Sequence, residues 1–300
     1  MVWIAVDWGT SNLRVWGIGA DGAVVAEASS DQGMGKLDRT GFEPALLALV
    51  GDWLPPGQKT LVIACGMVGA RQGWIEVPYR QAPCRPVFAD VVGTPETGDP
   101  RLAVRVLAGV KQIKPDPDVM RGEETQIAGF LAEDPEFEGT LCLPGTHTKW
   151  VRIEAGEIRH FKTFMTGELY NLLATQSVLR HSLNAAGWDG AEFARTVAAA
   201  ASQAPRFAER LFSIRAESLI GGLEPATAKA RLSAILIGAE LAAAQHYWFE
   251  GNLVIVGNGA QAETYAEGFL ALGRSPRLSD ATHVTLAGLK SAYQHIAREF

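Results

Sequence analysis

Ile4-Ala5-Val6-Asp7-Trp8-Gly9-Thr10-Ser11-Asn12 joins a short apolar run to a polar turn near the start of this 300-residue chain. The apolar run predicts a buried strand over residues 2–8, and two more strands are predicted at residues 13–18 and 24–28. Gly9 permits a tight turn, and the hydroxyl and amide groups that follow can offer hydrogen-bond donors to a phosphate group. Asp7 at the end of the strand could hold Mg²⁺ through water. A hairpin turn with a capping aspartate explains the same residues equally well.

A second turn of the same kind, Leu143-Pro144-Gly145-Thr146-His147-Thr148-Lys149, lies near the middle of the chain. It follows a strand predicted at residues 141–143 and precedes another at residues 150–153. By itself such a segment is more often a polar turn than a phosphate-binding loop. The recurrence nevertheless predicts two lobes, each opened by a hairpin. We expect an N-terminal lobe over residues 1–136 and a C-terminal lobe over residues 137–300, with a closing helix at about 285–298.

A third glycine turn follows a strongly apolar strand in Leu253-Val254-Ile255-Val256-Gly257-Asn258-Gly259-Ala260. A glycine pair between a strand and a helix start lets a ligand approach the bare backbone. The segment also matches the dinucleotide fingerprint G-x-G-x-x-A. Only residues 260–300 follow it, however, and a doubly wound domain needs several more strands after its fingerprint. An NAD-dependent oxidoreductase is therefore kept only as a distant alternative.

The composition argues against several classes of partner. Lysine and arginine number 27 against 33 aspartate and glutamate, and no basic run occurs, which argues against nucleic acid and anionic membranes as partners. The three cysteines, Cys65, Cys84 and Cys142, form no CxxC pair, which is typical of a reducing compartment. Without a basic leader or a segment long enough to span a bilayer, we expect a cytoplasmic protein. The oligomeric state stays open, and a homodimer is allowed.

Two further segments carry candidate substrate chemistry. Arg121-Gly122-Glu123-Glu124-Thr125 begins a helix predicted to end at residue 131. Acids in a first helical turn are commonly only partners of the helix dipole, but such a carboxylate can also accept a proton from a hydroxyl group. The loop-rich stretch at residues 66–100 is long for a compact domain, which is typical of functional loops. Its arginines could bind an anionic substrate or could simply be solvated.

These segments together carry a resemblance to a known family. The matching segments are Ile4-Ala5-Val6-Asp7-Trp8-Gly9-Thr10-Ser11-Asn12, Cys65-Gly66-Met67-Val68-Gly69, Gly73-Trp74-Ile75-Glu76-Val77-Pro78-Tyr79, Arg121-Gly122-Glu123-Glu124-Thr125-Gln126, Leu143-Pro144-Gly145-Thr146-His147-Thr148-Lys149-Trp150-Val151 and Met165-Thr166-Gly167-Glu168-Leu169. In combination they resemble the 2-dehydro-3-deoxygalactonokinase family, within the actin, hexokinase and sugar-kinase superfamily. The resemblance covers nearly the whole chain and is weaker after Gly190. Gly257-Asn258-Gly259 departs from it, because Gly-Ser-Pro is expected there.

The resemblance implies an α/β fold: a two-lobed, actin-like ATPase with a duplicated ribonuclease H-like unit and an interlobe cleft. It implies transfer of the γ-phosphoryl group of ATP to the 6-hydroxyl of 2-dehydro-3-deoxy-D-galactonate in galactonate and galactose catabolism, with Mg²⁺. The alternatives are a kinase for another small sugar acid and a phosphohydrolase of the same fold.

The resemblance also assigns roles to particular residues. Glu123 or Glu124 would accept the hydroxyl proton, and Asp7 would position Mg²⁺ through water. The residues expected to bind ATP or its phosphates are Gly9, Thr10, Ser11, Asn12, Gly145, Thr146, His147, Lys149, Gly257, Asn258 and Gly259. Those expected to bind the sugar acid are Gly66, Met67, Arg71, Trp74, Glu76, Tyr79 and Arg80.

Overall fold

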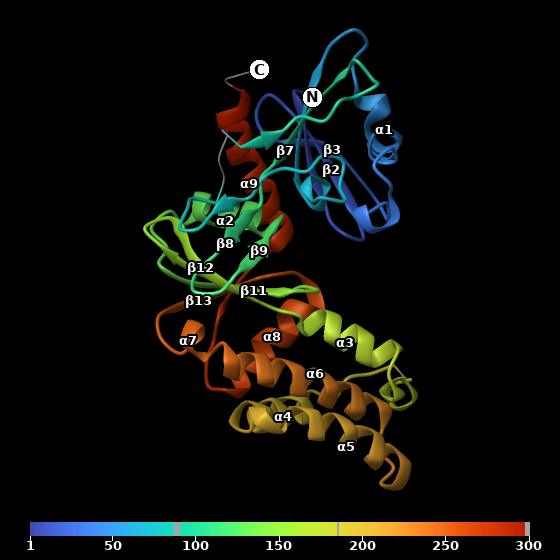
Figure 1. Ribbon diagram of the computed structural model, residues 1–300, viewed down its shortest axis with the longest axis vertical. Coiled ribbons are helices and arrows are strands. Elements are labelled where there is room, and N and C mark those ends of the chain that lie inside the picture. The colour runs from blue at the N-terminus through green and yellow to red at the C-terminus, as the bar shows by residue number, and fades with distance from the viewer. Residues whose placement is uncertain (87–90, 185, 298–300) are drawn as a thin grey trace. The chain divides into compact units, whose positions relative to one another are not determined.

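The computed structural model describes residues 1–86, 91–184 and 186–297, and the chain divides into two compact units (Figure 1). Unit 1 contains Met1–Phe137, Ile153–His160 and Ala281–Phe300, and unit 2 contains Glu138–Arg152 and Phe161–Asp280. The division after Phe137 lies one residue beyond the expected boundary. The assignment of the closing helix to the C-terminal lobe is wrong, because that helix belongs to unit 1. Part of the loop expected at residues 66–100 and the expected helix end at residue 298 fall outside the described residues.

The main sheet of unit 1 has the strand order β3-β2-β1-β4-β7-β6. Its strands are β1 (Trp3–Trp8), β2 (Leu13–Ile18), β3 (Val24–Ser30), β4 (Thr60–Gly66), β6 (Val92–Gly93) and β7 (Leu102–Leu107). The first three pair antiparallel in succession, whereas β1 pairs parallel with β4, and β4 with β7. Trp8 is in register with Gly66, so the turns after β1 and β4 begin at the same edge of the sheet. A smaller sheet contains β5 (Arg80–Gln81), β8 (Val110–Gln112) and β9 (Asp118–Met120).

Both faces of β1 are covered, which explains why its sequence is a continuous apolar run rather than an alternating one. Side chains of a strand alternate between the faces of the sheet. Ile4, Val6 and Trp8 pack into one apolar cluster together with Phe42 of α1 (Phe42–Val50). Trp3 and Ala5 pack into the opposite cluster, which α9 (Ala281–Ile296) covers with three buried apolar residues, Leu289, Ala292 and Ile296, and with partly buried ones.

The closing helix α9 belongs to unit 1, and not to the C-terminal lobe, because it packs on the main sheet of unit 1. The ring of Tyr293 on α9 stacks on Trp3, with centroids 4.5 Å apart. The helix also crosses α2 (Glu123–Glu133) at very short range, at Gly129 of α2 and Gly288 of α9. A Cβ atom at Gly129 would lie 1.8 Å from the carbonyl oxygen of Val284. This crossing fixes α2, whose first residues are the two candidate glutamates.

The sheet of unit 2 repeats the strand order of unit 1. Its order is β12-β11-β10-β13-β14, in which β10 pairs parallel with β13, and β13 with β14. The strands are β10 (Gly139–Leu143), β11 (Thr148–Glu154), β12 (Glu157–Phe164), β13 (Asn252–Val256) and β14 (Arg277–Ser279). In both sheets the order is third, second, first, fourth and fifth along the main strands. The predicted duplicated ribonuclease H-like fold, the architecture of two-lobed actin-like ATPases, is confirmed.

Helices form the remainder of unit 2. They are α3 (Thr166–Thr175), α4 (Gly190–Ser202), α5 (Phe207–Ile220), α6 (Pro225–Ala243), α7 (Gln245–Trp248) and α8 (Gly259–Ala271). The helices α4 and α5 lie beside α6 (Figure 1), and α3 and α8 also contact it, which explains why α6 has apolar residues on all sides. Helix α5 was not predicted from the sequence. Phe207, Leu211 and Ile214 face a core cluster at helical spacing, but the exposed apolar residues Phe212, Leu219 and Ile220 obscure that pattern. Among the described residues, no helix combines the length and apolar character needed to cross a membrane.

We predict that Gly129→Ala strongly destabilises unit 1. The added methyl group would collide with the backbone of α9, and such overpacking costs about 3 kcal/mol or more of unfolding free energy. Helix propensity alone would give the opposite sign, because alanine is favoured over glycine by roughly 1 kcal/mol in a helix. Gly51→Ala is the matched control, since Gly51 has helical φ and ψ and nothing lies within 4 Å of the position that an added methyl group would take. Urea unfolding of both variants measures the effect, and equal stabilities would contradict the prediction.

Candidate active site

The first glycine turn of unit 1 has the open polar edge that the sequence predicts. Its backbone is closed by a hydrogen bond of 2.9 Å from the Gly9 N–H to the Asn12 carbonyl, and the side chains of Thr10, Ser11 and Asn12 are exposed. A segment that was not predicted from the sequence packs against it. Met34 and Gly35 donate backbone hydrogen bonds to the carbonyls of Gly9 and Thr10, at 3.0 and 2.9 Å. A Cβ atom at Gly33 would lie 2.3 Å from the backbone of Ser11, so a side chain at this position would clash with the turn. The glycines at residues 33 and 35 were the feature of the sequence from which this contact could have been predicted.

Asp7 lies at the end of β1 and is paired with a cation. Its Oδ2 atom accepts a hydrogen bond of 2.5 Å from Arg14, which also donates to the hydroxyl of Thr282 at 3.0 Å. Its Oδ1 atom lies 3.9 Å from the sulfur of Cys65. Within the described part of the chain, no group of three or more acidic, histidine or cysteine side chains is arranged to hold a metal ion. A single carboxylate still fits Mg²⁺, because that ion is commonly held by one or two carboxylates together with substrate phosphates and water.

Two glycines bring the candidate glutamates to the same sheet edge as Asp7. Gly66 ends β4 with a φ of +91°, and Gly122 precedes α2 with a φ of +109°. A Cβ atom at Gly66 would lie 2.6 Å from the carbonyl oxygen of Trp8, and one at Gly122 would lie 3.3 Å from the Cα of Gly66. Only glycine satisfies both the backbone conformation and the close approach. The ends of β1 and β4 and the start of α2 therefore meet.

The two neighbouring glutamates have different surroundings. Glu124 is 1% exposed, and both of its carboxylate oxygens lie within hydrogen-bonding distance of the Gly122 N–H, at 2.9 and 2.7 Å. Glu123 is partly exposed, and its Oε2 atom accepts a hydrogen bond of 3.0 Å from the Arg121 N–H. Burial, followed by the charge of Glu123, raises the pKa of Glu124 to about 8. Glu124 therefore carries a proton near neutral pH.

The residues expected to bind the sugar acid are divided among the core, the surface and the region beside α2. Trp74 is in the apolar core, where its ring lies 6.2 Å from Trp8 and 6.3 Å from Phe42. Arg71 and Glu76 are exposed and form an ion pair of 3.4 Å. Gly66 is buried, and Met67, Tyr79 and Arg80 are partly buried.

Arg121 is a residue of this region to which the sequence alone assigned no role. Its guanidinium group is buried, lies 4.2 Å from the centroid of the Tyr79 ring and donates a hydrogen bond of 2.8 Å to the Val77 carbonyl. It therefore fixes the candidate substrate loop against the start of α2. Its position beside the two glutamates in the same motif was the feature of the sequence from which a role could have been predicted.

In unit 2, the second glycine turn packs against the beginning of α3. The Glu168 N–H donates a hydrogen bond of 2.9 Å to the Thr146 carbonyl, and a nitrogen of His147 lies 2.5 Å from a carboxylate oxygen of Glu168. A Cβ atom at Gly167 would lie 2.3 Å from the Gly145 carbonyl oxygen. The turn and a helix N-terminus thus lie together, an arrangement that favours anions. Lys149 is buried in β11, beyond the exposed part of the turn.

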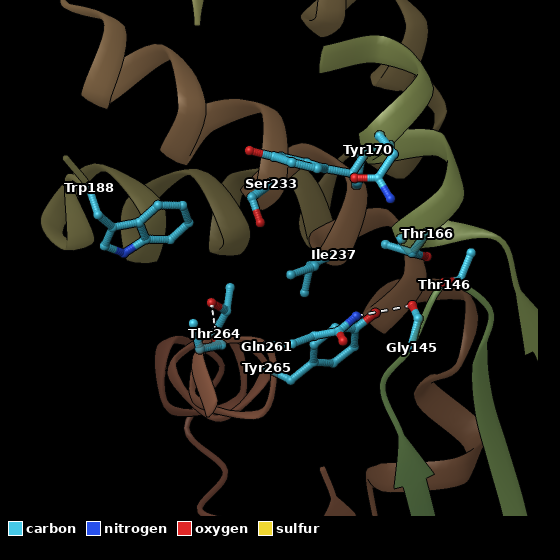
Figure 2. Close-up of a pocket in the computed structure, with 14 residues that line it drawn as sticks. Gly145, Thr146, Thr166, Tyr170, Trp188, Ser233, Ile237, Gln261, Thr264 and Tyr265 are labelled. Atoms are coloured by element: carbon cyan, nitrogen blue, oxygen red, sulfur yellow. Dashed lines mark hydrogen bonds between the residues drawn. The ribbon is translucent and has the colours of Figure 1, made fainter. Parts of the chain in front are cut away.

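A pocket of about 390 Å³ opens beside this turn (Figure 2). Figure 2 shows Gly145, Thr146 and Thr166 on one side and the indole ring of Trp188 on the other. The complete lining is Gly145, Thr146, Thr166, Gly167, Tyr170, Asn171, Trp188, Ser233, Leu236, Ile237, Ala260, Gln261, Thr264 and Tyr265.

The pocket joins the second glycine turn to the helix that follows the third. Gln261 donates a hydrogen bond of 3.0 Å to the Gly145 carbonyl. The lining from α8 begins at Ala260, directly after the predicted Gly257, Asn258 and Gly259. Of the lining residues, only Gly145 and Thr146 were predicted from the sequence. The others come from separate segments that only the fold brings together, and they include Tyr170, Trp188, Ser233 and Gln261.

Comparisons with known proteins agree on one family. The family model described as 2-keto-3-deoxy-galactonokinase matches residues 7–292. A Rhizobium meliloti (strain 1021) protein named "Probable 2-dehydro-3-deoxygalactonokinase DgoK1" is 38% identical over 300 residues, covering 97% of this chain and 96% of the relative. The 2-dehydro-3-deoxygalactonokinase of Escherichia coli (strain K12) is 31% identical over 302 residues, covering 98% of each chain.

A solved structure gives the same result. The crystal structure of a Sinorhizobium meliloti protein, provisionally named as a 2-dehydro-3-deoxygalactonokinase, is similar with a TM-score of 0.91 and 37% sequence identity. The alignment covers 98% of this chain and 99% of that chain. The similarity therefore includes both units.

We predict that Glu124→Gln makes the unfolding free energy less dependent on pH. The pKa of Glu124 is about 8 in the native state and near 4.5 once the chain unfolds, so the native state holds an extra proton between these values. The resulting stability is complete below pH 4.5 and is lost as the pH rises to about 8, by at most about 1.4 kcal/mol per pH unit. Urea unfolding at pH 5, 6, 7 and 8 measures this, with Glu136→Gln, an exposed glutamate of the same unit, as the control. Equal pH slopes for the wild type and Glu124→Gln would show that Glu124 does not titrate in this way.

Proposed function

The chain belongs to the 2-keto-3-deoxy-galactonokinase family, and on that premise we propose that it transfers the γ-phosphoryl group of ATP to the 6-hydroxyl of 2-dehydro-3-deoxy-D-galactonate. The observation that carries the proposal is the family match over residues 7–292, joined by two curated relatives that align over nearly the whole chain. The enzyme is thus a sugar-acid kinase of galactonate catabolism. Three buried free cysteines agree with the proposed cytoplasmic location.

The pocket of unit 2 is the proposed ATP site. Gly145 and Thr146 lie beside the N-terminus of α3, where backbone N–H groups and the helix dipole favour phosphate oxygens. Trp188 lies on another side of the pocket and offers an aromatic face on which the adenine base can stack (Figure 2). The phosphates therefore bind at the turn, and the base binds toward Trp188.

The Mg²⁺ that accompanies ATP fits the surroundings of Asp7. When bound, the ion neutralises negative charge on the transferring phosphoryl group. Asp7 would hold the ion through water, and Arg14 keeps the carboxylate oriented through its hydrogen bond to Oδ2. The exposed donors of Thr10, Ser11 and Asn12 then contact phosphate oxygens.

Glu123 is the proposed general base. Phosphoryl transfer depends mainly on positioning and charge stabilisation, so a carboxylate that accepts the hydroxyl proton is sufficient. Glu124 is unsuited to this role because it is buried and its raised pKa keeps it protonated near neutral pH. Glu123 is partly exposed, and the hydrogen bond from the Arg121 backbone orients its carboxylate.

The sugar acid binds between the glutamates and the loop that Arg121 fixes. Tyr79 and Arg80 are partly exposed beside this region, so they are better candidates for substrate contacts than the core residue Trp74. Arg71 is a weaker candidate for the substrate carboxylate, since it is exposed and already paired with Glu76. The homodimer, the expected interlobe cleft and the choice between related sugar acids stay predictions.

A coupled ADP-release assay over a panel of sugar acids and neutral sugars tests the proposed reaction. We predict the highest kcat/KM with 2-dehydro-3-deoxy-D-galactonate, and phosphate on its 6-hydroxyl in the product. The epimeric gluconate derivative and a neutral hexose are the matched acceptors, and a reaction without acceptor is the control. Equal ADP release without acceptor would instead support a phosphohydrolase, and a clear preference for another acid would support a different sugar-acid kinase.

Steady-state kinetics of Glu123→Gln and Glu124→Gln test the assignment of the base. Loss of a general base lowers kcat by about 10² to 10⁴, so Glu123→Gln should show a loss of this order. ATP affinity should change little, because the carboxylate faces the acceptor. Glu124→Gln should cost at most a few-fold, since glutamine resembles the protonated acid in shape and charge. The assignment is reversed if Glu124→Gln has the larger loss, and near-normal kcat in both variants would place the base elsewhere.

A further inference from the structure

A buried carboxylate lies behind the pocket of unit 2, and the proposed reaction gives it no role. Glu240 of α6 is 3% exposed. Its Oε1 atom accepts a hydrogen bond of 2.8 Å from the indole nitrogen of Trp150. Its Oε2 atom accepts a hydrogen bond of 2.7 Å from the hydroxyl of Tyr265 and another from the hydroxyl of Thr166. The carboxylate therefore has a donor-only partner on one oxygen and two hydroxyl partners on the other.

These contacts connect Glu240 to the parts that form the proposed ATP site. Thr166 and Tyr265 both line the pocket (Figure 2). Thr166 is the first residue of α3, next to Gly167, which packs on the phosphate turn. Tyr265 also shares a hydrogen bond of 2.8 Å with the hydroxyl of Thr148, the first residue of β11 after that turn. A change at Glu240 thus reaches the pocket through two hydroxyl groups.

The groups that hydrogen-bond to the Glu240 carboxylate are all neutral. Burial raises the pKa of Glu240 to about 7, and the hydrogen bonds from Thr166, Tyr265 and Trp150 oppose that rise. The ionisable groups that act on it from neighbouring elements are the phenol of Tyr265 on α8 and the thiol of Cys142 on β10. The pKa of each is raised, chiefly by burial, so both stay neutral near pH 7. Lys149 points to the opposite face of β11 from Thr148 and Trp150, because side chains alternate along a strand.

The charge of Glu240 decides which hydrogen-bonding groups the pocket offers. When Glu240 is ionised, both hydroxyl hydrogens point to Oε2, so Thr166 and Tyr265 present only lone pairs to a ligand. A proton cannot sit on Oε1 without losing the indole bond, since the Trp150 nitrogen can only donate. The proton therefore sits on Oε2 and is donated to one hydroxyl, whose own hydrogen is then free to point elsewhere.

We propose that Glu240 is a positioning residue that takes up one proton from solvent when nucleotide phosphates bind, and thereby turns the hydroxyl donor of Thr166 toward them. The hydroxyl of Tyr265 is not the donor, because the Thr148 hydroxyl lies 2.8 Å from it and takes up a released hydrogen. The inference rests on the proposed ATP site. Phosphate oxygens accept hydrogen bonds and carry negative charge, so they favour the neutral form of a nearby carboxylate in a site of low dielectric constant. The ionised form would instead present lone pairs to the phosphates and repel them.

Calorimetric titration with Mg-ADP tests this coupling. At pH 7.5, the binding enthalpy of the wild type in two buffers of different ionisation enthalpy should reveal proton uptake, and Glu240→Gln should show less. Because binding is linked to a group with a free pKa near 7, wild-type affinity should weaken about five- to tenfold between pH 6 and pH 8. For Glu240→Gln the change should be less than about twofold. Protons taken up or released by the nucleotide itself are the same for all variants. The contribution of Glu240 is therefore the difference in proton uptake between the wild type and Glu240→Gln.

Glu192→Gln is the matched control. Glu192 is also a buried glutamate of unit 2, but it pairs with Arg231 and does not line the pocket. This variant should lose stability yet keep the wild-type proton uptake, which separates the proposed coupling from general destabilisation. If Glu240→Gln does not fold, Tyr265→Phe replaces it. Loss of that donor raises the pKa of Glu240 in the free chain, so proton uptake at pH 7.5 should also fall.

The outcomes separate this inference from the proposed function. Nucleotide binding with equal proton uptake in the wild type and Glu240→Gln overturns the role of Glu240 and leaves the kinase assignment intact. Absence of nucleotide binding in the wild type overturns both. Reduced uptake in Glu240→Gln together with wild-type uptake in Glu192→Gln supports the coupling.

Discussion

The parallel pairing of β1 with β4 is the constraint on which the arrangement of the candidate site in unit 1 depends. It sets Trp8 opposite Gly66, so both strands end at one edge of the sheet. The approach of Gly66 to the Trp8 carbonyl leaves no room for a side chain, and Gly122 meets the same backbone. An aspartate, a phosphate-type turn and a glutamate pair are thereby gathered from segments more than a hundred residues apart in sequence. These close backbone contacts are possible only because glycine has no side chain.

In unit 2, a close contact between a glycine and a backbone carbonyl likewise positions a helix. Gly167 packs on the Gly145 carbonyl, which fixes the start of α3 against the second glycine turn. The pocket beside that contact has both polar and aromatic walls, as a nucleotide requires. Two of its lining residues, Thr166 and Tyr265, hydrogen-bond to the buried carboxylate of Glu240, which does not itself line the pocket. The two units thus carry dissimilar groups of candidate site residues at similar strand ends.

Local patterns predicted the local structure well. Apolar runs and the glycine turns after them indicated β1, β2, β10 and β13, because strand burial and turn chemistry are encoded in adjacent residues. Properties that depend on distant contacts were harder to predict. Trp74 looked like a ligand-binding aromatic residue, but the core position beside Trp8 and Phe42 becomes visible only in the fold. Trp188 and Gln261 reach the pocket from separate segments, and no spacing in the sequence links them to Gly145.

The position of α9 in unit 1 has a consequence for the order of events on the ribosome. Domains generally fold as units while the chain is being made, with the N-terminal one first. Here the helix that covers one face of β1 and contacts α2 emerges only after all of unit 2 has been synthesised. The earlier part of unit 1 must therefore wait with an apolar sheet face uncovered, while unit 2 already has its own core. The nascent chain is thus most exposed to aggregation and to chaperone binding in the half that emerged first.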